Sequence, residues 1–152
     1  MASRGFEFAY MLDGSGATPL IVDKILSTAA AHKIGDLMVI ESDGDLTQAA
    51  TNATEVFGVM QEAVAAADIT AGTTKAKVAI ITRNQVWRCS ADASTMSAVV
   101  GYTKTQNLVD CNTLDADVAT SGSMALVAKD QLDDDGNVLA YVTFADTTFG
   151  NT

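Results

Sequence analysis

The sequence is poor in the residues that carry most metal and redox chemistry. Its 152 residues include one histidine, His32, and two cysteines, Cys89 and Cys111. The cysteines show no CxxC spacing and have no histidine nearby, so a zinc site is not expected. Both lie in apolar stretches, where two buried free thiols are the expected state and a disulfide is the alternative. We therefore expect no bound metal and no cofactor.

Groups for nucleophilic or acid–base catalysis are also scarce. His32 has no serine or carboxylate partner at a recognisable spacing, and we interpret it as a surface or turn histidine. The chain lacks the GxSxG elbow of serine hydrolases, and the nearest approach to it is DGSGA around Ser15. The same stretch has no lysine, so it is not a phosphate-binding loop. We predict that the protein is not an enzyme; a carboxylate-pair hydrolase, which needs no fixed spacing, is the alternative.

Positive charge is limited to 9 Lys and Arg residues against 19 Asp and Glu, which gives a net charge of −10. Nucleic-acid binding relies on clustered basic residues that neutralise phosphates. The basic residues here are scattered, so we expect no direct nucleic-acid partner and no anionic membrane partner. No run approaches the ~18 apolar residues of a membrane helix, and no signal-peptide pattern follows Met1. These observations predict a soluble protein made in the cytosol.

What the sequence does contain is a series of short apolar runs separated by turn residues. Asp43-Gly44, Arg83-Asn84 and Asp135-Gly136 are typical hairpin or turn signals. Regular spacing of such runs predicts a mainly β fold, a small barrel or sandwich of short antiparallel strands. One short helix is expected at Ser94–Val100, ended by Gly101. The expected strands are Leu20–Leu26, Leu37–Glu41, Leu46–Ala50, Val56–Gln61, Lys77–Thr82, Gln85–Ser90, Asn107–Cys111, Ser123–Lys129 and Val138–Ala145.

Three local features refine this prediction. Gly58, inside an expected strand, indicates a bulge or a close backbone approach. Trp87 is the only tryptophan, and we interpret it as a core residue, with an interface anchor as the alternative. The acidic stretch at 130–135 is the best cation candidate in the chain. Its spacing fails the EF-hand pattern, so we interpret it as a solvated hairpin tip.

The first 18 residues differ from the rest. FEFAYML alternates weakly, and DGSG, with Gly14 and Gly16, then interrupts it. We predict an extended N-terminal arm over residues 1–18 and a single β-rich domain over residues 19–152.

The order of turns and strands between Ile34 and Ser90 resembles that of the head decoration proteins of tailed bacteriophages, also called cement or capsid-stabilising proteins. The matching segments are GDLMVI at 35–40, DG at 43–44, Leu46 and Ala49, VFGV at 56–59, AGTT at 71–74 and VAI at 78–80. The segment from Ser123 to Gly150 extends beyond the compact members of that family.

The resemblance implies a viral structural protein that is made in the host cytoplasm and lies on the outer capsid surface of the virion. Such a protein binds the major capsid protein and stabilises the shell against DNA pressure, as a homotrimer or alternatively a homodimer. Its arm would add a strand to the shell, and Phe6, Phe8 and Tyr10 would anchor that arm through alternate side chains. The alternative function is a virion surface or fibre domain that binds a host glycan or receptor near aromatic residues such as Trp87 and Tyr102.

Overall fold

The computed structural model describes residues 5–51, 53, 55–96, 107–117 and 124–144, and the chain is mainly β. The described strands are β1 (Glu7–Met11), β2 (Ile21–Ile25), β3 (Leu37–Ile40), β4 (Leu46–Gln48), β5 (Gly58–Met60), β6 (Lys75–Ile80), β7 (Gln85–Ser90), β8 (Leu108–Asp110), β9 (Thr113–Leu114), β10 (Met124–Leu132) and β11 (Val138–Phe144). A 3-10 turn, η1 (Ala66–Asp68), precedes β6.

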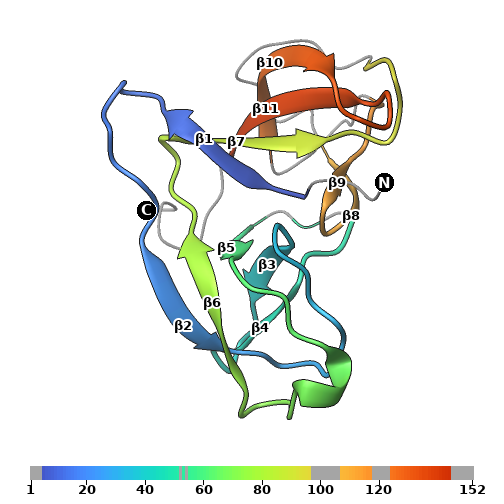
Figure 1. The fold of residues 1–152 in the computed structure, drawn as a ribbon. Coiled ribbons are helices and arrows are strands. Elements are labelled where there is room, and N and C mark those ends of the chain that lie inside the picture. The colour runs from blue at the N-terminus through green and yellow to red at the C-terminus, as the bar shows by residue number, and fades with distance from the viewer. Residues whose placement is uncertain (1–4, 52, 54, 97–106, 118–123, 145–152) are drawn as a thin grey trace.

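The strands form two main antiparallel sheets. A four-stranded sheet has the order β1-β7-β11-β10, and a five-stranded sheet has the order β2-β6-β5-β3-β4. Figure 1 shows the four-stranded sheet in the upper half of the molecule and the five-stranded sheet below it. β6 and β7 are consecutive in sequence but belong to different sheets, so the turn at residues 81–84 carries the chain from one sheet to the other.

Burial on both faces explains why β3 (LMVI) and β5 (GVM), inside the five-stranded sheet, are continuous apolar runs rather than alternating ones. Leu37, Val59 and Ala79 belong to the core that the sheet shares with β7, β10 and β11. Their neighbours Met38, Met60 and Val78 point to the opposite face and form a second core with Leu26, Leu46 and Phe57. A bridge between Leu26 and Leu46 brings the end of β2 to β4, so this sheet curls strongly.

The turns follow the sequence signals. Gly44 joins β3 to β4 at φ +91°, and Gly136 joins β10 to β11 at φ +83°, both in the left-handed region that favours glycine. Gly58 is required for another reason, the close approach predicted for it. A Cβ at this position would lie 2.4 Å from the backbone oxygen of Ala79 on β6.

Asp36, the aspartate of the GD motif, is buried and joins three segments. Its carboxylate accepts hydrogen bonds from the Lys33 backbone N–H, Gln48 Nε2 and Asn112 Nδ2, each at 2.9 Å. Asn112 lies in the turn between β8 and β9, and the adjacent Cys111 carbonyl accepts from the Leu37 N–H at 2.7 Å. These bonds hold the small β8–β9 hairpin against the five-stranded sheet.

The prediction of an extended arm over residues 1–18 is wrong for the part that the structure describes from Phe6 to Met11. β1 pairs with β7 as an edge strand of the four-stranded sheet. Phe6 is 2% exposed and packs in the shared core against Phe144, with ring centroids 5.7 Å apart. Apolar side chains from this segment fill the core, and their burial stabilises β1 in the body of the protein.

The short helix expected at Ser94–Val100 lies largely outside the described residues, and Ser94–Met96 are not helical. His32 is not a surface histidine: it is buried beside Val64, with which it forms an isolated backbone bridge, and neither ring nitrogen has a hydrogen-bond partner among the described residues. Backbone pairing through His32 N–H and C=O draws the segment inward.

Candidate interaction surfaces

The outer edge of β2 is one place where backbone groups face away from the fold. The Ile80 N–H donates to the Leu20 carbonyl, and the Leu26 N–H donates to the Thr74 carbonyl. Because hydrogen-bonded pairs alternate along an antiparallel ladder, the backbone groups of Ile21, Asp23 and Ile25 point away from β6. β4 meets this side of β2 only at its end, where Leu26 bridges Leu46 and the Ser27 N–H donates to the Leu46 carbonyl at 2.8 Å. The edge therefore offers the outward backbone donors and acceptors of Ile21 and Asp23 to an incoming strand.

Large apolar side chains surround this edge. Leu20, Ile34 and Ile21 are 67%, 62% and 53% exposed. Ile21 and Ile34 line a cleft of about 320 Å³ at the junction of the two sheets, whose floor includes Phe8, Trp87 and Ala79. We call the exposed group Leu20, Ile21 and Ile34 the β2 shelf. The shelf and the free backbone groups lie side by side, which is the arrangement used for strand addition.

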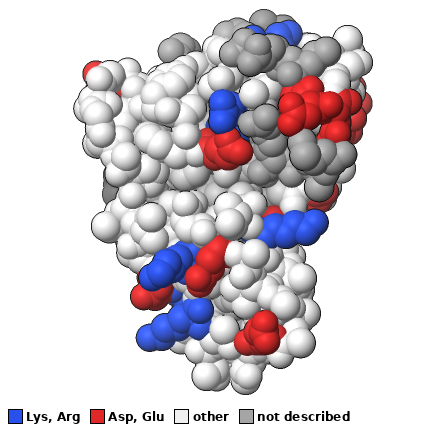
Figure 2. Space-filling model, in the orientation of Figure 1, with Lys and Arg blue, Asp and Glu red and all other residues white. Residues whose placement is uncertain are grey.

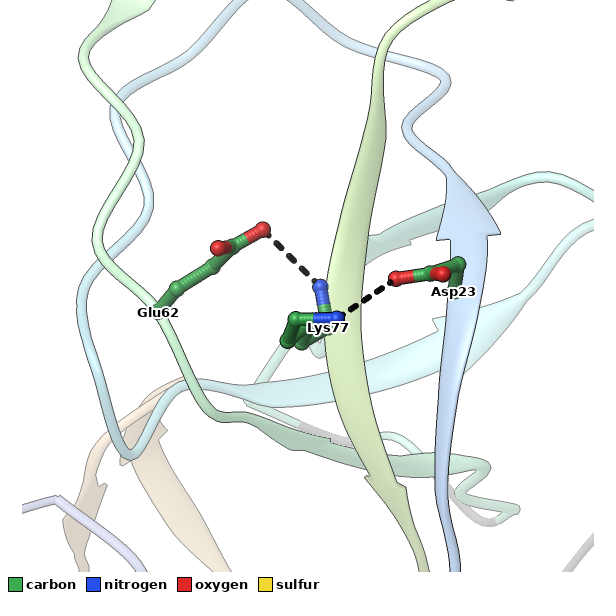
Figure 3. Close-up of polar contacts among 3 residues, drawn as sticks. All are labelled: Asp23, Glu62 and Lys77. Carbon is green, nitrogen blue, oxygen red and sulfur yellow. Dashed lines mark hydrogen bonds and ion pairs between the residues drawn. The ribbon is translucent and has the colours of Figure 1, made fainter.

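Charged groups beside the β2 edge are already engaged. Lys77 Nζ lies 3.4 Å from Asp23 Oδ1, and the Lys77 backbone N–H donates to Glu62 Oε1 at 3.0 Å, as Figure 3 shows. Figure 2 shows that most of this face of the molecule is uncharged, with small groups in which acidic and basic residues lie next to each other and one purely acidic group at the upper right. An uncharged face favours contacts made by packing and backbone hydrogen bonds.

A second hollow, of about 510 Å³, lies on the outer face of the four-stranded sheet. We call it the tyrosine hollow, and its lining is Phe8, Ala9, Tyr10, Arg88, Ala128 and Tyr141. Arg88, Tyr141 and Ala128 are directly paired across β7, β11 and β10, so they form one row on this face. Glu7 continues the row on β1 and forms an ion pair with Arg88. The hydrogen bond that Arg88 donates to the Glu7 carboxylate is the main reason that the pKa of Arg88 is raised, with a smaller contribution from Tyr141.

A β-bulge places Tyr10 on the same outer face. The register of β1 against β7 shifts between Phe8 and Tyr10, so Ala9 is the extra residue. Glu7 then faces outward, Phe8 inward, Tyr10 outward again and Met11 inward. Tyr10 is 44% exposed, and its ring centroid lies 6.3 Å from that of Tyr141.

The three residues predicted to anchor an arm therefore have different positions. Phe6 is in the core, and Phe8 packs edge-to-face on Trp87, with ring centroids 5.7 Å apart. Only Tyr10 is exposed. Strict alternation would have kept all three on one face, and the bulge at Ala9, which no sequence signal marks, separates them. Sequence reasoning missed the β2 shelf, although Leu20 and Ile21 directly follow the only proline.

Aromatic residues proposed as receptor contacts also differ from expectation. Trp87 is 1% exposed, and its Nε1 donates to Gln85 Oε1 at 3.1 Å, which confirms the core interpretation. Tyr102 lies outside the described residues. Cys89 is buried and Cys111 partly buried, and both are free thiols as expected. Burial raises the pKa of both thiols, that of Cys111 to about 12 with the help of the Asp36 and Asp110 charges.

The residues that could hold a metal ion or act as a nucleophile and base are not brought together within the described ranges. No three His, Cys, Asp or Glu side chains there are grouped to hold a metal ion. Ser15 lies in the exposed loop between β1 and β2, and its N–H donates to Asp13 Oδ1, whereas His32 is buried. The described part of the chain contains no helix of the length and hydrophobicity needed to cross a membrane.

Comparison with known proteins adds no relative. The chain matches no protein-family model, and no curated protein gives a significant match.

Proposed function

We propose that this chain is a viral structural protein, a capsid decoration protein that binds the outer surface of the major capsid protein shell of a bacteriophage and stabilises it against DNA pressure. It acts there as a homo-oligomer, a homotrimer rather than a homodimer, and it has no catalytic role. The proposal rests on the family resemblance of residues 34–90 and on one structural observation, the open β2 edge beside the β2 shelf.

Strand addition at β2 supplies affinity without a specialised chemical group. An extended segment of the shell would bond to the outward backbone groups of Ile21 and Asp23 and cover Leu20, Ile21 and Ile34. Exposure of these apolar side chains to water is unfavourable, and their burial contributes roughly 25 cal/mol per Å² of apolar surface removed from water. Many copies on one shell then hold together with modest affinity at each site.

Charge favours the shell rather than a second copy as the occupant of this edge. A two-fold pairing of β2 with itself, centred on Asp23, would place two aspartates directly opposite each other. Like charges in that position are destabilising. Homo-oligomer contacts are therefore expected on another surface of the molecule.

The test is co-sedimentation of the purified protein with expanded phage heads that lack it, followed by counting copies per head. Saturable binding in a fixed ratio to the major capsid protein is the expected result, and decorated heads should withstand higher temperature before releasing DNA. Failure of the wild-type protein to bind any expanded head would overturn the proposed function.

Matched variants test the β2 edge. Asp23→Pro removes an outward N–H without breaking the bonds between β2 and β6, because the Asp23 N–H faces away from β6. Asp23→Ala removes only the carboxylate and keeps the N–H. We expect Asp23→Pro to bind heads poorly and Asp23→Ala to bind as the wild type does. Ile21→Ser should also weaken binding, whereas Val109→Ser, at an exposed apolar residue on β8, should not.

A further inference from the structure

We propose that the tyrosine hollow binds a neutral saccharide. The hollow lies on the outward face of the four-stranded sheet, and its volume of about 510 Å³ falls within the roughly 300–1,000 Å³ that is typical of small-molecule sites. It opens on a different sheet from the β2 shelf, so a ligand there does not compete with strand addition at β2.

The aromatic pair carries the first part of the proposal. The Tyr10 and Tyr141 rings lie 6.3 Å apart and are inclined by 32° to each other, so they offer adjacent apolar faces with a hydroxyl at the end of each ring. Tyrosine combines an apolar ring with a polar tip and loses little conformational entropy on contact. Pyranose rings have the matching character, since their C–H faces pack on aromatic rings and their hydroxyls form hydrogen bonds.

The charge balance decides between a neutral and a charged ligand. Arg88 at the floor of the hollow is already paired with Glu7, so the site carries no unbalanced charge. An acidic ligand would have to compete with Glu7 for the guanidinium, and a basic ligand would meet Arg88. Arg88 Nε is buried without a hydrogen-bond partner among the described residues. The Arg88 side chain as a whole is 33% exposed. The hydroxyls of a neutral saccharide can accept hydrogen bonds from Arg88 and can both donate to and accept from the tyrosine hydroxyls. These contacts leave the ion pair between Arg88 and Glu7 in place.

The β-bulge at Ala9 indicates that this face is organised around Tyr10. Without the extra residue, Tyr10 would point into the core and Met11 would be exposed. Bulges re-aim side chains in this way next to functional sites. The bulge therefore brings a second ring beside Tyr141 and completes the hollow.

Binding at this hollow requires no capsid, so the test uses the isolated protein and its outcome is separate from that of the head-binding experiment. The probe is a printed array of neutral and acidic oligosaccharides, drawn partly from bacterial surface polysaccharides and partly from glycoproteins, which distinguishes the two sources. The best oligosaccharide is then titrated while backbone amide NMR signals are recorded. We expect saturable binding of neutral oligosaccharides, with shifts concentrated on β1, β7 and β11.

Two substitutions and one control assign the site. Tyr10→Ala removes an exposed ring and should weaken binding about tenfold, the effect of losing one good aromatic contact. Tyr141→Phe keeps the ring but loses the hydroxyl and should weaken binding less. Leu12→Ala changes an exposed apolar residue outside the hollow and should have no effect. Absence of neutral-saccharide binding, binding of acidic saccharides only, or unchanged binding by Tyr10→Ala would each overturn the proposal.

Discussion

Gly58→Ala provides the sharpest test of how the five-stranded sheet is packed. Gly58 does not have a positive φ, so its backbone conformation is open to alanine. The added methyl group would instead lie 2.4 Å from the Ala79 backbone oxygen and 2.6 Å from Val78 Cγ1, where ordinary contact begins at about 3.4 Å. The nearest obstacle is backbone, so β5 and β6 must separate by about 1 Å, and this distorts the pairing of Gly58 with Ile80.

Overpacking of this kind costs about 3 kcal/mol at the upper end of the usual range. For a chain of this length each kcal/mol lowers the Tm by roughly 2–4 °C, so we expect Gly58→Ala to melt roughly 6–12 °C below the wild type. Thermal unfolding followed by circular dichroism measures the shift directly. Urea unfolding gives the free energy and shows whether the slope with denaturant has changed.

Gly16→Ala is the matched control. A Cβ at Gly16 meets no atom within 4 Å, and the residue lies in the exposed loop between β1 and β2. Alanine there reduces the freedom of the unfolded chain and should raise stability by up to about 1 kcal/mol. If Gly58→Ala melted within about 2 °C of the wild type, the close approach of β5 and β6 would be refuted.

Three other predictions concern groups held by the fold. Asp36→Ala leaves three donors without their charged acceptor and should lower the free energy of unfolding in urea by about 3–5 kcal/mol, whereas Asn112→Ala, which removes one of these bonds, should cost about 1 kcal/mol. The pKa of Cys111 is raised from its ordinary value of 9.0 to about 12, and that of Cys89 is also raised. The folded state therefore holds these thiols protonated more strongly than the unfolded state does. The resulting stability is complete below pH 9 and is lost as the pH rises toward 12. Urea midpoints should therefore fall above pH 9, and less steeply in a Cys111→Ser variant. Lys77→Ala removes an ion pair whose side chains are about 60% exposed, and should change the unfolding free energy by less than about 1 kcal/mol.

Much of the strand pattern could be predicted because it depends on local signals. Apolar runs bounded by Asp43-Gly44 and Asp135-Gly136 gave the β3–β4 and β10–β11 hairpins, since these turns need residues that adopt a positive φ. The close backbone approach at Gly58 and the core position of Trp87 were also predicted correctly. A glycine inside a strand and a lone tryptophan have few structural roles. The prediction of an extended N-terminal arm failed because FEFAYML alternates only weakly and has no turn signal of its own before DGSG, so the sequence does not mark it as a strand of the sheet.

The sequence by itself determined the β class, most of the turns and the scarcity of chemically reactive groups, because composition and residue conformation act locally. Only the tertiary structure decided which strands share a sheet. β6 and β7 look like a hairpin in the sequence, yet they lie in different sheets because each buries its apolar side chains against other strands. The surfaces depend on that choice. The β2 edge is open at Ile21 and Asp23 because β2 is the last strand of its sheet and β4 reaches it only at Leu26. Tyr10 meets Tyr141 because a bulge turns it outward. Strand order and bulges arise from packing between residues far apart in the chain, which a linear pattern does not encode.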